Sequence, residues 1–156
     1  MVGSTDTTEP HTPAELIASA VQTEKEAALF YTMMADLTSD ADARKMLLDL
    51  ADDETSHATT LANLYFEMTG NGITESTTVQ PEGEPNLFDF TTASRREALE
   101  FALRNESNAA DLYQAEAESS DNPRVATIFR LLADTEREHA AYLQLQIDRM
   151  DDPDTL

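Results

Sequence analysis

Cysteine and tryptophan are absent from this 156-residue sequence. Without a thiol, the chain can form no disulfide, and its own residues offer no thiol catalysis, zinc ribbon or iron–sulfur ligation. Glycine is also scarce, with only four residues, and three of them fall between positions 70 and 91 together with two of the six prolines. This clustering indicates that residues 70–91 form a loop.

Long apolar runs are missing as well. No stretch approaches the roughly 20 apolar residues that span a bilayer, and residues 1–12 lack the apolar segment of a signal peptide. We therefore expect neither a membrane span nor a leader, and a cytoplasmic location. Since apolar residues still make up 40% of the chain, it is long and apolar enough for one globular domain with a real core.

Basic residues are few. Lysine and arginine total 10 against 31 acidic residues, a formal charge of −21, and Lys25 and Lys45 are the only lysines. So negative a field repels nucleic acid phosphates and anionic lipid, which excludes both as expected partners. The composition resembles that of proteins from salt-loving archaea, and because salt screens self-repulsion it predicts a fold that needs high salt. The alternative is an ordinary acidic protein.

Apolar residues recur at helical spacing in four segments. The pattern predicts an all-α fold with helices at about 13–38, 40–69, 92–119 and 122–150, a crossover at 70–91, and frayed ends at 1–11 and 151–156. Thr12 and Glu15 predict a capping box at the first helix, and Gly70 predicts the end of the second. Side chains expected to fill the core or to pin the loop to it are Met33, Met34, Met46, Leu87, Phe88 and Phe90.

The sequence contains an internal repeat. LADDETSHA at 50–58 aligns with LADTEREHA at 132–140 after a shift of 82 positions, the spacing between His57 and His139. The same shift aligns further pairs: Glu24 with Glu106, Tyr31 with Tyr113, and Glu54 with Glu136. Each half therefore predicts a helical hairpin. Neither hairpin could bury its apolar face alone, so the two are expected to pack into a four-helix bundle.

The polar residues of the repeat are expected to meet inside the bundle. Glu24 and Glu54 each lie 15 positions from residue 39, the predicted turn, so they should stand at the same height on neighbouring helices. Glu54 and His57 are one turn apart within an apolar stripe, as are Glu136 and His139. The pattern therefore directs six side chains at a common interior point: Glu24, Glu54, His57, Glu106, Glu136 and His139.

Four buried carboxylates must take up protons or bind cations. Two divalent cations would balance their charge, and carboxylate and imidazole donors without sulfur favour iron or manganese, with zinc less favoured. A single E-x-x-H on an acidic helix is usually only a solvated patch, but the doubled motif argues against coincidence. His11, in the N-terminal tail, is not expected to be a ligand. Tyr31 and Tyr113 are either core aromatics or hydrogen-bond donors to the ligand carboxylates.

The sequence contains the same pattern twice: a Glu, a Tyr seven residues after it, and an E-x-x-H motif that begins thirty residues after it. This pattern resembles the ferritin-like superfamily, and the LADDETSHA and LADTEREHA segments are most similar to rubrerythrin-like proteins. The resemblance implies parallel second and third helices. It also implies two iron ions bridged by Glu54 and Glu136. Two departures stand out: Ala109 occupies the place of an extra ligand Glu of peroxidase-type rubrerythrins, and no Cys-rich rubredoxin module is present. Any electron donor must then be external.

The resemblance implies a di-iron oxidoreductase that reacts Fe(II) with O₂ or H₂O₂, in iron oxidation or in removal of oxidants. Two alternatives remain. One is oxidation of an organic substrate in a pocket beside small residues, namely Ala27, Ala28, Ala109 and Ala110, which could equally allow close helix packing. The other is a non-catalytic metal-binding or interaction module. Rubrerythrin-like proteins commonly form homodimers, and apolar residues such as Leu64 and Phe66 near a helix end would permit this.

Overall fold

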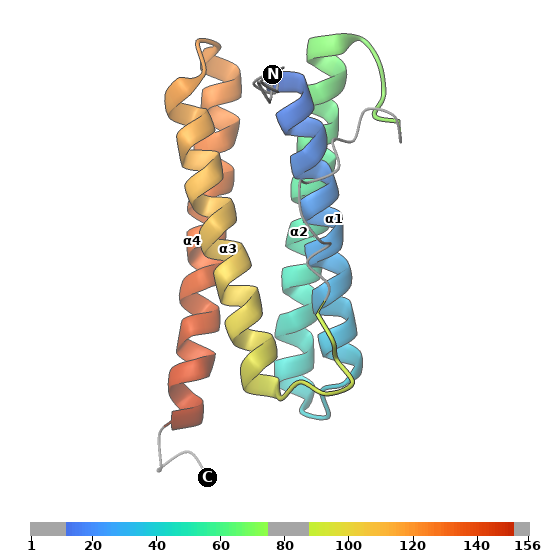
Figure 1. Cartoon of the computed structure of the whole chain (residues 1–156), viewed down its shortest axis with the longest axis vertical. Coiled ribbons are helices and arrows are strands. Elements are labelled where there is room, and N and C mark those ends of the chain that lie inside the picture. Colours follow the sequence, from blue (N-terminus) through green and yellow to red (C-terminus); the bar gives the residue numbers. More distant parts are fainter. Residues whose placement is uncertain (1–11, 75–87, 152–156) are drawn as a thin grey trace, which may run out of the picture.

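The computed structural model describes residues 12–74 and 88–151. Within these residues there are four α-helices and no strand. The helices are α1 (Pro13–Asp36), α2 (Ala41–Thr69), α3 (Arg95–Ser119) and α4 (Pro123–Asp151). They form two hairpins, α1 with α2 and α3 with α4, that stand side by side (Figure 1). The predicted all-α four-helix bundle is confirmed.

The direction of the helices fits the expected topology. In Figure 1, α1 runs down, α2 runs up, α3 starts at the bottom and runs up, and α4 runs down. Helices α2 and α3 are therefore parallel, as the ferritin-like resemblance implies. The middle of the expected crossover (75–87), with Leu87, lies outside the described residues, as do the termini 1–11, with His11, and 152–156. Among the described residues, no helix has the length and apolar character needed to cross a membrane.

The helix ends follow local sequence signals. At the start of α1, Glu15 N donates to Thr12 Oγ1 over 3.2 Å and Thr12 N donates to Glu15 Oε2 over 2.9 Å, which completes the predicted capping box. Gly70 ends α2 with a φ of 72°, in the left-handed region that favours glycine. Both capping predictions are confirmed.

Helix α3 begins at Arg95, three residues after the expected start at Thr92. The reason is a second capping box, in which Ser94 N donates to Glu97 Oε2 over 2.6 Å and Glu97 N donates to Ser94 Oγ over 3.1 Å. The preceding residues turn around Asp89, whose carboxylate accepts from Thr91 N over 2.9 Å. The S-x-x-E signal was readable in the sequence and outweighs the helical pattern before it.

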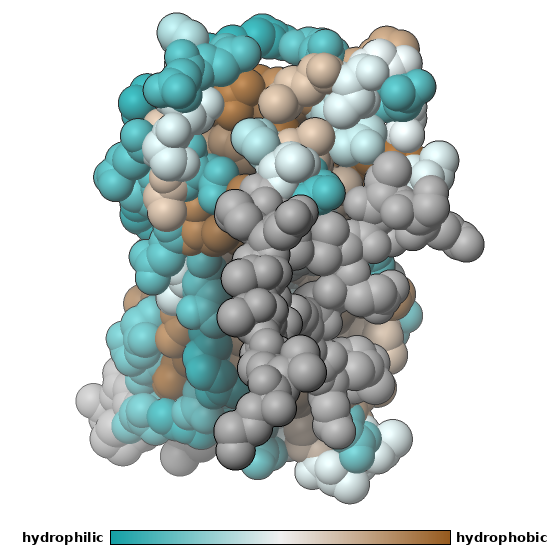
Figure 2. Space-filling model, turned by 45° about the horizontal axis from the view of Figure 1, so that its top comes forward, coloured by the Kyte–Doolittle hydropathy of each residue, from teal (hydrophilic) through white to brown (hydrophobic). Residues whose placement is uncertain are grey.

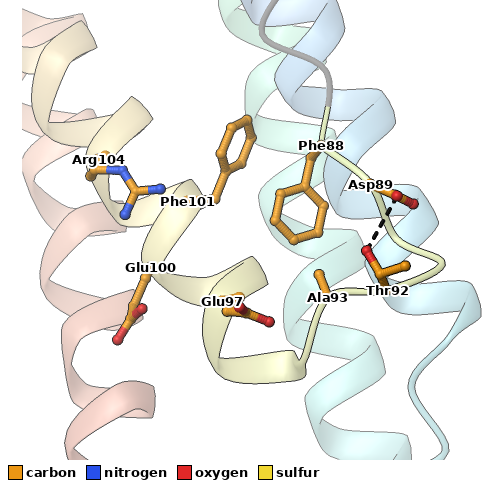
Figure 3. A pocket seen from close by; sticks show the side chains of 8 residues that line it. All are labelled: Phe88, Asp89, Thr92, Ala93, Glu97, Glu100, Phe101 and Arg104. Atoms are coloured by element: carbon orange, nitrogen blue, oxygen red, sulfur yellow. Dashed lines mark hydrogen bonds between the residues drawn. The ribbon is translucent and has the colours of Figure 1, made fainter.

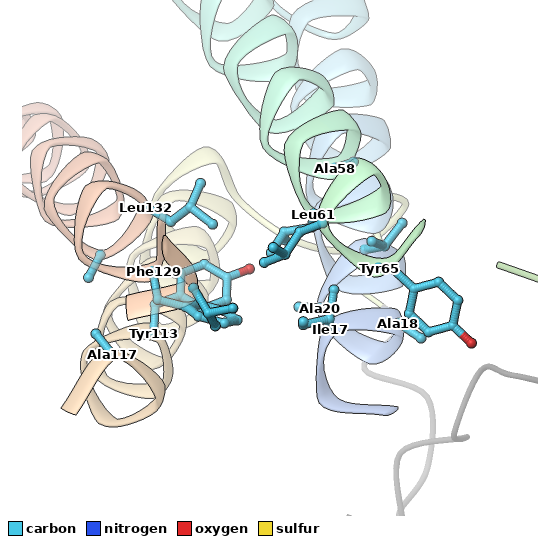
Figure 4. Packing of buried hydrophobic residues seen from close by; sticks show 14 residues of the cluster. Ile17, Ala18, Ala20, Ala58, Leu61, Tyr65, Tyr113, Ala117, Phe129 and Leu132 are labelled. Atoms are coloured by element: carbon cyan, nitrogen blue, oxygen red, sulfur yellow. The ribbon is translucent and has the colours of Figure 1, made fainter. Parts of the chain in front are cut away.

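Two apolar layers fill the bundle, one toward each end. One layer lies at the end with the α3–α4 turn and includes Ile17, Leu61, Tyr113 and Phe129 (Figure 4). The layer toward the opposite end is built from Tyr31, Met34, Ala35, Leu47, Leu50, Ala51, Ala98, Leu99, Ala102, Leu143 and Ile147. Each layer draws residues from all four helices, so it ties the two hairpins together. The buried polar residues lie between the two layers.

Some expected core positions are exposed. Met33 and Met46 are 42% and 39% exposed, so their assignment to the core is wrong, whereas Met34 is buried. The buried stripe of α1 runs through Tyr31, Met34 and Ala35, and Met33, two positions after Tyr31, points about 200° away from that residue. Leu64 is buried and so unavailable to a dimer surface, while Phe66 is exposed. On the face seen in Figure 2, hydrophilic residues cover most of the described surface and apolar residues emerge in separate groups.

Phe88 and Phe90 anchor the described end of the connection, as predicted for these two residues. Their rings lie 5.4 and 5.1 Å from that of Phe30 on α1, and Phe88 lies 4.9 Å from Phe101 on α3. Aromatic pairs at these distances contribute stability beyond their buried area. The contacts join α1, the chain before α3, and α3 itself at one end of the bundle.

Candidate metal centre

Every helix contributes at least one acid to the middle of the bundle. Glu54 and Glu136 are 1% and 0% exposed, values normally seen for core aliphatic side chains. They and the other four members are the buried charged or polar residues of the described chain: Glu24 on α1, Glu54 and His57 on α2, Glu106 on α3, and Glu136 and His139 on α4. The structure thus brings all six sequence-predicted residues into one buried cluster.

Each imidazole reaches most closely to the opposite hairpin. His57 Nδ1 lies 2.9 Å from Glu136 Oε1, and His139 Nδ1 lies 2.8 Å from Glu54 Oε1. The glutamate one turn earlier on each histidine's own helix is slightly farther, at 3.5 Å for Glu54 and 3.3 Å for Glu136. The two rings stack at 5.8 Å between centroids. Glu54 and Glu136 therefore lie between the two imidazoles.

The donor atoms separate into two overlapping groups. In each group one atom from every residue lies within 4.8 Å of the others, a spacing that can surround a metal ion. One group contains Glu24, Glu54, His57 and Glu136, and the other contains Glu54, Glu106, Glu136 and His139. Glu54 and Glu136 belong to both groups. This arrangement has the form of two adjacent cation positions with two shared carboxylates.

Two tyrosines hold the remaining carboxylates across the hairpin boundary. Tyr31 Oη donates to Glu106 Oε1, and Tyr113 Oη donates to Glu24 Oε1. In Figure 4 the Tyr113 hydroxyl points toward the first hairpin. Burial, and then the neighbouring glutamate, raise the pKa of each tyrosine well above its ordinary value. Both hydroxyls therefore stay protonated as donors.

Burial and neighbouring groups divide the carboxyls into two kinds. Burial raises the pKa of Glu24 and Glu106 to about 9, against the opposing effect of His57 and His139 respectively. Burial alone would also raise the pKa of Glu54, but the imidazoles of His139 and His57 lower it to about 2. The pKa of Glu136 is lowered in the same way, by the same two imidazoles.

The histidines balance these charges when no cation is present. Burial alone would lower the pKa of His57, but the carboxylates of Glu136, Glu24 and Glu54 raise it to about 12. The pKa of His139 is likewise raised by its three glutamates. Two imidazolium ions then face two carboxylates, with two neutral carboxyls beside them, so four protons make the cluster neutral. Two divalent cations on the fully deprotonated cluster would also make it neutral.

Three buried atoms of the cluster have no hydrogen-bond partner in the described chain: Glu54 Oε1, Glu136 Oε2 and His139 Nδ1. Although His139 Nδ1 is only 2.8 and 3.3 Å from the two oxygens, the directions do not suit hydrogen bonds. A buried polar atom without a hydrogen bond is costly, even where an opposite charge lies close by, as it does here. Three such atoms aimed at one small volume have the geometry of ligands, and the cluster fits a di-metal site.

The structure also brings in one residue that the sequence analysis missed. Asp53, on α2, lies with its Oδ2 3.2 Å from Nε2 of His139 on α4. Its side chain is 59% exposed, so its position in the helical pattern alone suggests only a solvated acid. The available signal was that Asp53 adjoins Glu54 in the repeat. Its contact with α4 depends on how the hairpins face each other.

A hollow of about 350 Å³, lined in part by Phe88 and Phe101, lies beside the start of α3 (Figure 3). Its other lining residues are Asp89, Thr92, Ala93, Glu97, Glu100 and Arg104. None of the six cluster residues lines it. The hollow therefore gives no support to oxidation of an organic substrate at the cluster. Of the small residues considered for such a pocket, Ala110 is buried and Ala109 packs against an apolar layer, in keeping with close helix packing.

A four-helix bundle with a carboxylate-rich di-metal centre defines the ferritin-like class. The sequence matches the family described as Rubrerythrin over residues 14–89 and 97–155. The chain belongs to the rubrerythrin family. It is therefore a ferritin-like protein of the di-metal oxidoreductase kind, and the resemblance seen in the sequence is confirmed.

Individual relatives match most of the chain. A Bacillus subtilis (strain 168) protein described as uncharacterized protein YhjR is 26% identical over 126 residues, which cover 81% of this chain and 80% of that protein. A hypothetical protein from Pyrococcus furiosus has a similar solved structure, with a TM-score of 0.76, 24% identity, and coverage of 88% of this chain and 89% of that one.

The manganese catalase KatB from Anabaena PCC7120 is also structurally similar, with a TM-score of 0.66 and 17% identity. The match covers 98% of this chain and 83% of that chain. An uncharacterized conserved protein from Magnetospirillum magnetotacticum MS-1 gives a TM-score of 0.66 at 23% identity, covering 89% and 95% of the two chains. At these identities the structural likeness shows the shared fold.

Proposed function

We propose that this protein is a di-iron oxidoreductase that reacts Fe(II) with O₂ or H₂O₂, in oxidation of ferrous iron or in defence against oxidants. The observation that carries the proposal is the buried cluster of four carboxylates and two imidazoles, three of whose atoms make no hydrogen bond within the described chain. Membership in the rubrerythrin family supports iron. The structural similarity to a manganese catalase makes manganese the second metal to test.

Glu54 and Glu136 are the proposed shared ligands, because both belong to each four-residue group. Glu24 and His57 complete one position. Glu106 and His139 complete the other. Tyr31 and Tyr113 orient the two unshared carboxylates through hydrogen bonds from the opposite hairpin, so neither glutamate is free to swing toward solvent.

Iron bound by these six residues would supply the redox chemistry, namely two electrons that, with two protons, would reduce O₂ to H₂O₂ or H₂O₂ to two waters. The chain contributes the geometry and a dry environment, since apolar layers lie on both sides of the cluster. It has no cysteine, so a thiol or iron–sulfur centre of its own cannot return the electrons. We therefore assign that task to an external electron donor.

The test is anaerobic addition of two equivalents of Fe(II) to metal-free protein, followed by admission of O₂ or H₂O₂. Formation of a diferric centre should produce near-ultraviolet absorption. Glu54→Ala and His139→Ala should abolish it, because each removes a ligand that the pair requires. Glu26→Ala is the matched control, since Glu26 is an exposed glutamate on the same helix as Glu24.

An unchanged signal in both ligand variants, with wild-type helicity by circular dichroism, would refute the proposal. Elemental analysis of the purified protein, together with anomalous scattering at the iron and manganese edges, identifies the resident metal. Stoichiometric metal without any turnover of oxidant would favour the non-catalytic module.

A further inference from the structure

His57 and His139 are equivalent in the repeat, but the outward-facing nitrogens of their rings have different surroundings. In both rings Nδ1 is the atom that approaches the glutamates, so Nε2 faces away from the cluster. His139 Nε2 lies 3.2 Å from the carboxylate of Asp53. In the described part of the chain, no residue forms a hydrogen bond or ion pair with Nε2 of His57.

The difference comes from a single position of the repeat. Asp53 precedes Glu54 on α2, and 82 residues later Thr135 precedes Glu136 on α4. Thr135 Oγ1 donates to the carbonyl of Leu131 in its own helix over 3.1 Å. Because the Thr135 hydroxyl is neutral and donates to its own backbone, it is not a charged hydrogen-bond acceptor like the carboxylate of Asp53.

We propose that Asp53 is a positioning residue that makes the two metal positions unequal, so that the position at His139 binds metal more tightly and fills first. This inference rests on the proposed di-metal function. When Nδ1 of a histidine binds a cation, the ring proton must sit on Nε2. Asp53 accepts that proton in a hydrogen bond, which holds the ring orientation and raises the basicity of the ligating nitrogen. Among residues 12–74 and 88–151, no carboxylate gives His57 equivalent support.

The tyrosine contacts and the shared glutamates are matched in the two halves of the site. Each unshared glutamate accepts one hydrogen bond from the tyrosine of the other hairpin, and both shared glutamates belong to both groups. Outer carboxylate partners of this kind change metal affinity by about 10- to 100-fold. Because the Asp53 side chain is 59% exposed and therefore screened, we expect about tenfold, the lower end of that range.

The test is a titration of metal-free protein with Mn²⁺ in molar KCl, monitored by isothermal titration calorimetry. Wild-type protein should show two binding events that differ about tenfold in affinity. Asp53→Thr copies the residue of the second hairpin and should merge them into one weaker class. Thr135→Asp places a carboxylate opposite His57 and should strengthen the weaker event. Asp53→Asn keeps an oxygen acceptor without the charge and should recover part of the effect.

Variants that keep only one of the two metal positions show which half of the site Asp53 affects. In a His57→Ala protein, which retains the His139 position, Asp53→Thr should weaken Mn²⁺ binding about tenfold. In a His139→Ala protein the same substitution should change nothing. Asp52→Thr, at the exposed neighbouring position, is the matched control and should leave both events unchanged. A merely structural role of Asp53 would affect both backgrounds alike.

The outcomes separate this inference from the proposed function. Failure of wild-type protein to bind two metal ions per chain, with Mn²⁺ in this titration and with Fe(II) in the anaerobic test, would overturn both. Two equal binding events in wild-type protein would overturn only the inequality, and so would an effect of Asp53→Thr that persists without His139.

Discussion

The first hairpin (α1 and α2) and the second (α3 and α4) carry equivalent residues on their inner faces and different residues on their outer faces. Paired positions are buried alike: Tyr31 and Tyr113 are each 1% exposed, and Glu54 and Glu136 are 1% and 0% exposed. The outer faces differ in their basic residues. Both lysines lie in the first hairpin, whereas every arginine except Arg44 lies in the second.

This contrast shows which part of the duplication the fold constrains. Each inner face carries polar groups whose shortest ion-pair and hydrogen-bond contacts are with the opposite hairpin, such as His57 with Glu136 and Tyr31 with Glu106. A change there would leave an uncompensated buried charge, which is strongly destabilising. An exposed ion pair contributes at most about 1 kcal/mol, so the outer faces can differ freely.

The largest expected effect separates shared from unshared glutamates. Glu54→Ala or Glu136→Ala should remove both metal ions, because each of these residues belongs to both four-residue groups. Glu24→Ala or Glu106→Ala should leave one ion per chain. Elemental analysis after loading with Mn²⁺ and gel filtration checks this, with Glu26→Ala as a control that retains two. Equal losses from all four variants would break the proposed division of the site into two positions.

The stability of the chain should depend on salt, and low salt should destabilise the first hairpin more than the second. The melting temperature should rise by roughly 10 °C between dilute buffer and molar KCl, because salt screens the repulsion within a chain of formal charge −21. At low salt, amide hydrogen exchange should increase first in α1 and α2, which hold only three of the ten basic residues. A melting temperature that does not move with KCl would refute the dependence on salt.

The pH dependence of the metal-free protein tests whether the two unshared glutamates are equivalent. Burial raises the pKa of Glu24 and Glu106 to about 9, so the folded chain keeps two protons that the unfolded chain releases near pH 4.5. The stability they confer is complete below pH 4.5 and is lost as the pH rises through 9. The raised pKa of His57, about 12, adds to the decline above pH 6.5.

The melting temperature of metal-free protein should therefore fall between pH 5 and 9, with each retained proton contributing up to about 1.4 kcal/mol per pH unit. The melting temperature of metal-loaded protein should fall less over the same pH range, because metal binding itself strengthens as the ligands deprotonate. Glu24→Gln and Glu106→Gln should flatten the metal-free slope equally. Unequal flattening would show that the two halves already differ without metal.

The smallest effect concerns the two tyrosines. Tyr31→Phe and Tyr113→Phe each remove one hydrogen bond to a buried glutamate, so each should lower the free energy of unfolding by about 1–3 kcal/mol. The two losses should match, because the two hydrogen bonds join equivalent positions of the repeat across the hairpin boundary. Urea unfolding of metal-free protein measures both. Double substitution should be nearly additive, and a large difference between the single variants would contradict the symmetry of the inner faces.

Much of this architecture could be read from the sequence, because the signals are local or repeated. Helical spacing and the doubled E-x-x-H motif predicted the bundle, and Thr12 and Gly70 marked helix ends. The errors have physical causes. Ser94 caps α3 later than the apolar pattern suggested, and Met33 lies outside the buried stripe that Tyr31 and Met34 form on α1.

The sequence by itself determined that two copies of a helical hairpin each bring a glutamate and an E-x-x-H to an inner face, because side-chain direction follows from 3.6 residues per turn. Only the tertiary structure decided which atoms meet across the hairpins: His139 with Asp53, and each tyrosine with the opposite hairpin's glutamate. Those contacts depend on the distance and rotation between two packed hairpins, and no spacing within one helix encodes either quantity.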